Sequence, residues 1–446
     1  MDIQPRTQRK VRPREAEQIL TALEGGVVPG VGIQHLLVGR SREVEELIRI
    51  LDRIKHGGSD LRIWVGDFGS GKSFMLRTIE QLALQNNFVS STLDLTPSRR
   101  FYASDGKALA LYQEIIKQLR TRGVGEGNAL GSILEQWFLP WLYEEKIDLF
   151  SEDEPDSQAI RRVEEKILQT ISGFRSGGLS YELGQCAVQY LRGMVYRETD
   201  RKMQAIRWLG GLIPTKTEAK RELGIGQIIS DDNWSLMLPL LTELFRAVGF
   251  NGFIVNFDEL VNLYKLPRSQ TRDQNYELIL NIYNLCKSGQ LEGLFVNLGA
   301  TRNTVFNERR GMAGYGALKG RFGIEQEELS HLTDTRATLQ ILKPLTPEEI
   351  FTLLEKLQEI MQVSQPSDRV FSADQIARYM QAQLNRPGAD EFLTPRAVIK
   401  DYLQLLRLAR QNPDTEIDRL LELRFGNLGQ VTMDADNQDE LGIEII

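Results

Sequence analysis

The feature that most constrains this chain is a strand, a glycine-rich turn and a helix predicted in direct succession between residues 61 and 82. The segment "LRIWV" (61–65) is a short apolar run of the kind that forms a buried parallel strand. In "FMLRTIEQL" (74–82) apolar residues recur at helical spacing. The turn "GDFGSGKS" (66–73) fits the pattern G-x-x-x-x-G-K-[ST]. Strand, turn and helix together predict a phosphate-binding loop.

The residue types in this loop suit the phosphates of a nucleoside triphosphate. Glycines let backbone N–H groups turn inward around phosphate oxygens, and the helix N-terminus adds its positive end. Lys72 is expected to bridge the β- and γ-phosphates of ATP, and the Ser73 hydroxyl to ligand Mg²⁺. A chance glycine-rich turn is the alternative, and the flanking strand and helix disfavour it. The expected ATP contacts are Gly66, Asp67, Phe68, Gly69, Ser70, Gly71, Lys72, Ser73 and Phe74.

Length and composition limit the remaining choices. A chain of 446 residues with 41% hydrophobic residues suggests two or three structural units with ample core. A net charge of −7 disfavours nucleic-acid binding over the whole surface but allows a local basic patch. Two distant cysteines give no disulfide framework. The sequence has no apolar run of transmembrane length and no signal peptide, so we expect a cytoplasmic protein without membrane association.

The order of apolar runs predicts an α/β fold with a five-stranded parallel sheet. The expected strands are 61–65, 86–95, 253–258, 293–300 and 337–344. "TPEEI" has Thr346, Pro347 and Glu349 in a capping-box pattern that starts a helix. We expect six parts, namely an N-terminal arm and short helix (1–35), the first part of the core (36–120), a helical insertion (121–245), the second part of the core (246–345), a helical lid (346–426) and an acidic tail (427–446).

Adjacent acids at the end of the third strand add the chemistry of hydrolysis. In "FIVNFDEL", Asp258 is predicted to hold the hydration shell of Mg²⁺, as a Walker-B aspartate does. Glu259 is placed to orient or deprotonate the water that attacks the γ-phosphate. A surface Asp-Glu pair at a strand end is the alternative, and the phosphate loop upstream favours the catalytic interpretation.

The fourth strand ends in "LGATRN". In P-loop ATPases with an additional strand, a polar residue at this point (sensor 1) contacts the γ-phosphate or the attacking water. Thr301 and Asn303 are better candidates than Arg302, and a plain turn is an equal alternative.

The order of these parts resembles the AAA+ ATPases, in particular the branch of origin-recognition and clamp-loader proteins. "HLLVGR", with Gly39 and Arg40, is similar to the N-terminal box that touches adenine in that branch. The resemblance implies an arginine finger between the fourth and fifth strands, for which Arg321 is the first candidate and Arg310 the second. It also implies a sensor 2 arginine, Arg396, on a lid helix. The long interval from Lys72 to Asp258 departs from a minimal AAA+ core, as does the short chain after the lid.

More specifically, the chain resembles the ATP-binding proteins of BREX-type bacterial phage-defence loci (BrxD-like). The similar stretches lie between residues 15 and 410 and are "VGRSREVEEL", "GDFGSGKSF", "IRWLGG", "TKTEAKRELGI", "DDNW", "GFNGFIVNFDEL", "LGATRN" and "LTPRAVIKDYL". The resemblance implies an ATPase that works beside other defence proteins, often helicase-like ones.

Two hypotheses of different classes remain. The first is a Mg²⁺-dependent AAA+-like ATPase that converts ATP hydrolysis into conformational work on DNA or a partner protein. It is expected to self-associate, with ATP sites at subunit interfaces, and to contact its partner through the insertion. The second is a nucleotide-gated switch or scaffold with little turnover. A P-loop kinase is disfavoured by Glu259. The basic arm at residues 6–14 is a possible contact to DNA phosphates, and a solvated terminus is the simpler interpretation.

Overall fold

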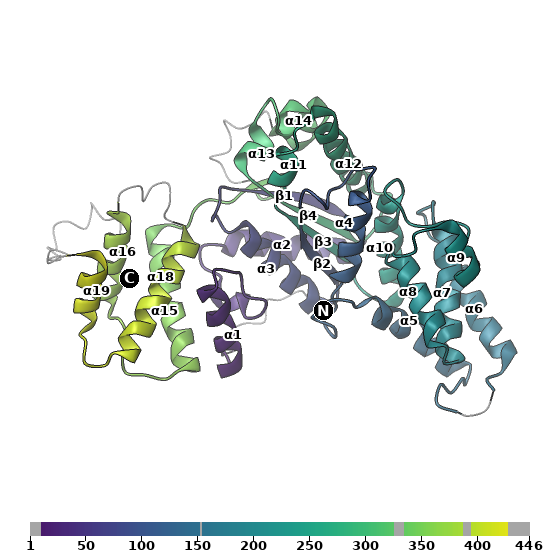
Figure 1. Cartoon of the computed structure of the whole chain (residues 1–446), viewed down its shortest axis with the longest axis horizontal. Helices are drawn as coiled ribbons and strands as arrows, with labels where there is room; N and C mark the ends of the chain where they lie inside the picture. The colour runs from purple at the N-terminus through teal and green to yellow at the C-terminus, as the bar shows by residue number, and fades with distance from the viewer. Residues whose placement is uncertain (1–9, 152–153, 325–333, 387–393, 427–446) are drawn as a thin grey trace. The chain divides into compact units, whose positions relative to one another are not determined.

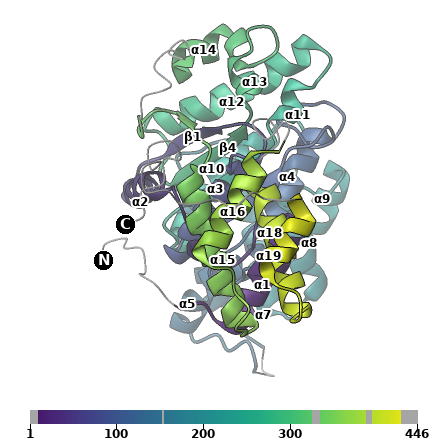
Figure 2. The same ribbon diagram turned by 90° about the vertical axis from the view of Figure 1, so that its left-hand side faces the viewer.

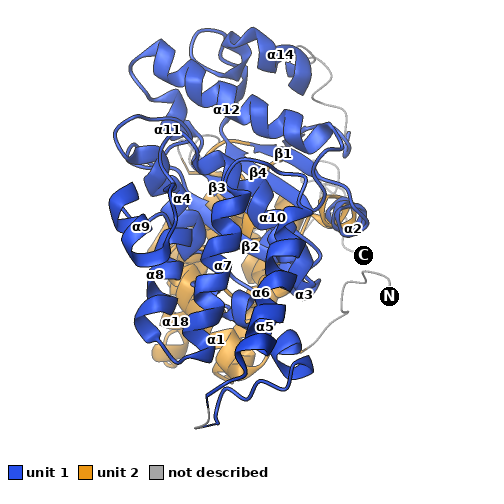
Figure 3. Ribbon diagram, turned by 90° about the vertical axis from the view of Figure 1, so that its right-hand side faces the viewer, with its two compact units in different colours: residues 1–3, 46–65, 79–341 blue, residues 4–45, 66–78, 342–446 orange. Residues whose placement is uncertain are grey.

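The computed structural model describes residues 10–151, 154–324, 334–386 and 394–426 (Figure 1). The chain divides into two compact units, coloured separately in Figure 3. The sheet unit comprises residues 1–3, 46–65 and 79–341, and the loop–lid unit comprises residues 4–45, 66–78 and 342–446. Residues 6–9 of the basic arm and all of the acidic tail expected from the sequence lie outside the described residues.

The sheet unit contains a five-stranded sheet in which all strand pairs are parallel, in the order β2-β3-β4-β1-β5. The strands are β1 (Asp60–Val65), β2 (Val89–Asp94), β3 (Phe253–Asp258), β4 (Leu294–Ala300) and β5 (Leu339–Ile341). Strand β4 lies between β1 and β3, so an additional strand separates the strand before the phosphate loop from the strand that ends in acids. The predicted five-stranded parallel sheet is confirmed.

Two strands are shorter than the sequence predicted. Strand β2 begins at Val89 rather than at residue 86, because Asn87 adopts φ +57° and turns the chain after the preceding helix. Strand β5 keeps only Leu339–Ile341 and is half-buried, whereas the other four strands are almost wholly buried. Strand β5 pairs with β1 over only three residues, so its apolar pattern overstates its length.

The remaining elements of the sheet unit are helices around one continuous core. Helices α2 (Ser41–Lys55) and α3 (Lys72–Gln85) have residues in both units. Those wholly within the sheet unit are α4 (Lys107–Lys117), α5 (Leu130–Glu144), α6 (Ser157–Ser172), α7 (Ser180–Val195), α8 (Thr199–Leu209), α9 (Lys216–Leu223), η2 (Trp234–Leu236), α10 (Met237–Val248), α11 (Val261–Tyr264), α12 (Ser269–Lys287), α13 (Arg302–Phe306), η3 (Met312–Gly314) and α14 (Gly316–Phe322).

Helices α5 to α10 occupy the chain between β2 and β3, where the sequence predicted a helical insertion. Helix α7 packs against α6 and α8, and α10 packs against both α5 and β3 (Figure 1). Trp137, Trp208 and Trp234 are buried, and Trp141 packs against the same core. The insertion therefore shares its hydrophobic core with the sheet.

A chain of buried hydrogen bonds crosses the four longest strands. Trp64 Nε1 donates to Asn297 Oδ1 at 3.0 Å, and Asn297 Nδ2 donates to Asn256 Oδ1 at 3.0 Å. Asn256 Nδ2 then donates to Thr92 Oγ1 at 2.9 Å. We call Trp64, Asn297, Asn256 and Thr92 the polar ladder. Because unpaired buried polar groups are costly, the ladder fixes how β1, β4, β3 and β2 align.

The loop–lid unit has its own core, formed by helices from both ends of the chain. Helix α1 packs against α15 and α18, and α16 packs against α15 and α19 (Figure 2). The predicted capping box of α15 is present, because the Thr346 hydroxyl accepts from Glu349 N and the Glu349 carboxylate accepts from Thr346 N. The helices are α1 (Pro13–Glu24), η1 (Ile33–Leu36), α15 (Pro347–Ser364), α16 (Ala373–Leu384), α18 (Pro395–Gln411) and α19 (Ile417–Phe425).

Candidate nucleotide-binding site

The glycine-rich loop has the backbone conformation that its sequence predicts. Gly69 and Gly71 adopt φ +84° and +94°, a region that L-residues rarely enter. A Cβ on Gly66 would lie 2.3 Å from Ser70 Oγ, so this position has no room for a side chain. Helix α3 begins at Lys72, directly after the last glycine. The loop therefore presents backbone amides and a helix N-terminus, the combination that suits phosphate oxygens.

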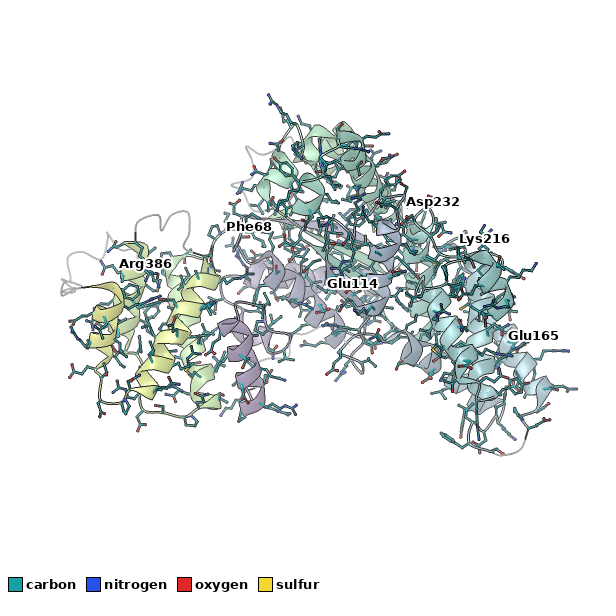
Figure 4. All side chains as sticks on the ribbon, viewed as in Figure 1. Phe68, Glu114, Glu165, Lys216, Asp232 and Arg386 are labelled. Carbon is teal, nitrogen blue, oxygen red and sulfur yellow. The ribbon has the colours of Figure 1, made fainter. Side chains whose placement is uncertain are left out.

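The Lys72 ammonium is held inside the loop. Its Nζ donates to the carbonyl oxygens of Gly66 at 2.9 Å and Asp67 at 2.8 Å, and it lies 5.6 Å from the centre of the Phe68 ring. Phe68 itself is 68% exposed (Figure 4). Phe74, near the start of α3, packs against the core of the loop–lid unit. A positive charge thus lies within the glycine turn.

Arg40 ties the loop to the residue Lys343 through hydrogen bonds to backbone carbonyls. It is buried, and its Nη2 donates to Ser70 O at 3.2 Å and to Lys343 O at 2.7 Å. Its Nη1 lies 3.4 Å from Glu43 Oε1. Gly39 has φ +66°, and a Cβ there would lie 2.4 Å from the Glu349 carboxylate. The two residues that the AAA+ resemblance assigned to adenine therefore brace the loop backbone and the start of α15.

The lid helix α18 begins against the phosphate loop. Thr394 caps α18 by accepting from Ala397 N, and a Cβ on Gly69 would lie 2.5 Å from its methyl carbon. Arg396 is exposed two residues further on. The loop–lid unit thus brings together the phosphate loop, Arg40 and the N-terminal end of the helix with the predicted sensor 2 arginine. Thr394 was missed because only the fold brings it to Gly69.

The acidic pair lies at the carboxyl end of β3 in the sheet unit. Asp258 is buried, and its Oδ1 accepts from Glu259 N at 2.8 Å. Glu259 is exposed and has φ +59°. Left-handed backbone costs an ordinary residue about 1 kcal/mol, and such outliers cluster at functional sites. Asp94 at the end of β2 pairs in register with Asp258. Asp94 is not among the predicted site residues, although it ends β2 as Asp258 ends β3.

The two sensor 1 candidates differ in their surroundings. Thr301 is buried and caps α13, because its hydroxyl accepts from Thr304 N and lies 2.8 Å from Thr304 Oγ1. Asn303 is exposed on α13. Helix α11, which follows Glu259, packs against α13. The acidic pair and the sensor 1 candidates therefore share the carboxyl edge of the sheet.

The two candidate arginine fingers also differ. Arg310 Nη2 donates to Tyr264 O at 3.2 Å and Leu266 O at 3.0 Å, and its guanidinium lies over the Tyr264 ring. Arg321 is exposed on α14, and its carbonyl oxygen accepts from the Tyr283 hydroxyl at 3.2 Å. The ring of the next residue, Phe322, packs against Tyr283 and fixes this end of α14. Arg321 is thus the better placed of the two to reach another chain.

Each unit carries an oxygen donor of the kind that Mg²⁺ prefers. Mg²⁺ takes hard oxygen ligands and usually needs only one or two from the protein, because phosphates and water supply the rest. The Ser73 hydroxyl at the start of α3 and the Asp258 carboxylate at the end of β3 are such donors. The described residues contain no group of three or more His, Cys, Asp or Glu that could hold a metal ion unaided.

The parallel sheet, its additional strand β4 and the glycine-rich loop after β1 define a P-loop α/β protein. The chain belongs to the BREX system ATP-binding protein BrxC/D family, whose model matches residues 11–424. This confirms the resemblance to BREX-type ATP-binding proteins. A search of curated proteins found no match. Within the described ranges, none of the helices combines the length and apolar character needed to span a membrane.

Proposed function

We propose that this chain is a cytoplasmic, Mg²⁺-dependent ATPase that couples ATP hydrolysis to conformational work on DNA or a partner protein in BREX-type defence. One observation carries the proposal, which is that a phosphate loop follows β1 while an acidic pair ends β3, with β4 between the two strands. This strand order and the family's ATP-binding character support it. The motif order assigns the loop and the acidic pair to the same nucleotide.

Each residue then has a defined task. The loop amides and Lys72 bind the β- and γ-phosphates, and Ser73 with Asp258 would hold Mg²⁺. The ion would supply positive charge that offsets the charge on the phosphates. Glu259 accepts the proton of the attacking water as general base, and an exposed side chain at the end of β3 suits this task. Arg396 and a sensor residue, Thr301 or Asn303, are assigned to the γ-phosphate by resemblance.

The insertion is the proposed contact to the partner. Tyr143, Phe150 and Tyr181 belong to this region and are 86%, 89% and 70% exposed. Exposed aromatic side chains are frequent in protein interfaces, and insertions on a rigid core commonly determine specificity. The sheet and the phosphate loop need none of these side chains.

Replacement of the loop lysine tests the ATP site. Lys72→Ala should abolish Mg²⁺-dependent ATP binding in calorimetry and ATP turnover, because the phosphates lose their main cation. Lys400→Ala is a matched control, since Lys400 is exposed on α18. Equal ATP affinity of Lys72→Ala and the parent would refute the loop assignment. Binding without turnover in the parent would favour the nucleotide-gated switch.

A further inference from the structure

A cavity lies at the amino edge of the sheet, opposite the edge at which β3 ends in Asp258. It has a volume of about 590 Å³, within the usual range for small-ligand sites. Its walls are the start of β1, the second half of α2, the end of α12 with residues 289–291, and Arg336. All of these belong to the sheet unit.

The lining of this cavity is strongly basic. Five cationic side chains line the cavity, against two acidic ones, Glu46 and Asp60. The cations therefore outnumber the carboxylates by three. Four of the five cations come from α2, β1 and α12, elements that are fixed in the core. The basic lining residues are Arg49, Arg53, Arg62, Lys287 and Arg336.

Asp60 organises the cations. Its fully buried carboxylate lies 2.5 Å from Arg53 Nη2 and 3.2 Å from Arg62 Nε, and it also accepts from Lys287 Nζ. Burial alone would raise the pKa of Asp60, but the charges of these three cations lower it below the usual value. One ionised carboxylate therefore holds three cations at the cavity wall.

Arg62 and Arg336 show that the cavity is built rather than accidental. Arg62 is buried, and its Nη1 donates to Thr335 O at 2.9 Å and also to Ala337 O. These bonds hold the backbone on both sides of Arg336, whose exposed side chain lines the cavity. Arg49 Nη1 lies 3.4 Å from Glu46 Oε2, but the cations still outnumber the carboxylates, and an anion with several oxygens would offset the remaining positive charge.

We propose that this cavity binds a phosphate group, supplied either by the DNA backbone or by a free polyphosphate. The site is distinct from the acidic end of β3. Each strand residue advances about 3.3 Å, so the six residues of β3 place the two sheet edges about 20 Å apart. The ligand would therefore bind independently of the catalytic residues in the sheet unit.

The experiment reverses the charge of Arg49 and Arg336, the two exposed cations of the cavity that are not bonded to Asp60. Arg49→Glu/Arg336→Glu is made in a Lys72→Ala background, which removes phosphate binding at the glycine loop. Arg122→Glu/Arg161→Glu is the control, because both residues are exposed and the charge change is the same. The probes are inorganic pyrophosphate in calorimetry and a labelled duplex of about 20 base pairs in fluorescence anisotropy.

We expect the cavity variant to lose at least about tenfold in affinity for one of the probes, while the control stays near the background protein. A loss for the duplex identifies DNA as the source, and a loss for pyrophosphate alone identifies a free polyphosphate. Equal losses in both variants, or no binding by the background protein, would overturn the proposal. If charge reversal prevents folding, Arg49→Gln/Arg336→Gln serves the same comparison.

Discussion

At the scale of single residues, the contacts of Arg40 suggest an alternative to the role that the AAA+ resemblance implies. The AAA+ pattern places its counterpart at adenine, whereas here its guanidinium donates to the carbonyls of Ser70 and Lys343. A lysine cannot reproduce this forked geometry although it keeps the charge. We therefore propose that Arg40 holds the loop backbone, which every nucleoside triphosphate would use in the same way.

Arg40→Lys should weaken ATP and GTP binding by the same factor, about tenfold, because a charged hydrogen bond to the loop is lost. Calorimetric titration with both nucleotides measures this. Arg42→Lys is the control, since Arg42 is exposed in the first turn of α2, two residues after Arg40. A change in the ratio of ATP to GTP affinity would show that Arg40 contacts the base instead.

At the scale of secondary-structure elements, the polar ladder links four strands. We therefore expect the hydrogen bonds of the ladder to stabilise the sheet cooperatively. Replacing Asn297 by Leu removes its hydrogen bonds with Trp64 Nε1 and Asn256 Oδ1, which should cost about 2–4 kcal/mol of unfolding free energy. Asn256→Leu breaks the same central bond. The double variant should therefore cost less than the sum of the single variants, with a coupling of about 1 kcal/mol.

Denaturant unfolding of the three variants measures this coupling. The control pairs Asn297→Leu with Asn275→Ala, because Asn275 bonds to the backbone of Tyr102 and is not part of the ladder. The control pair should be additive. Additivity in the ladder pair as well would mean that its bonds act separately.

Local patterns predicted the elements well because their causes are local. The strand ends at Val65, Asp258 and Ala300, and the capping box at Thr346, follow from apolar runs and cap chemistry within a few residues. Long-range partners could not be predicted in this way. Arg40 and Lys343 are 303 positions apart, and Asp60 and Lys287 are 227 positions apart. Only the packed fold shows that Arg310 binds its own chain.

At the scale of the whole molecule, the charge that builds on the γ-phosphate in the transition state calls for a further cation beside Lys72. An arginine supplied by another subunit can contribute about 10³- to 10⁵-fold in rate. Arg321 is exposed on α14, whereas Arg310 is bonded to the carbonyls of Tyr264 and Leu266. We therefore expect ATP sites that are completed by Arg321 of a neighbouring copy.

Mixing two inactive variants tests this expectation. Glu259→Gln lacks the base and Arg321→Ala lacks the finger, so a mixed assembly contains some sites with both residues intact. ATP turnover should reappear on mixing, while Lys72→Ala mixed with Glu259→Gln should stay inactive, because both residues are assigned to the nucleotide of their own chain. A protein that stays monomeric with ATP, with no recovery at any ratio, would exclude shared sites.

The central claim is that Glu259 activates the water that cleaves ATP. Its most direct test is the nucleotide recovered from the protein after incubation with Mg²⁺ and ATP, for the parent, Glu259→Gln and Asp94→Asn. Glu259→Gln should retain ATP uncleaved, because the amide keeps the shape but accepts no proton, and turnover should fall about 10²- to 10⁴-fold. The parent and Asp94→Asn should contain ADP. ADP in Glu259→Gln at the parental rate would contradict the account.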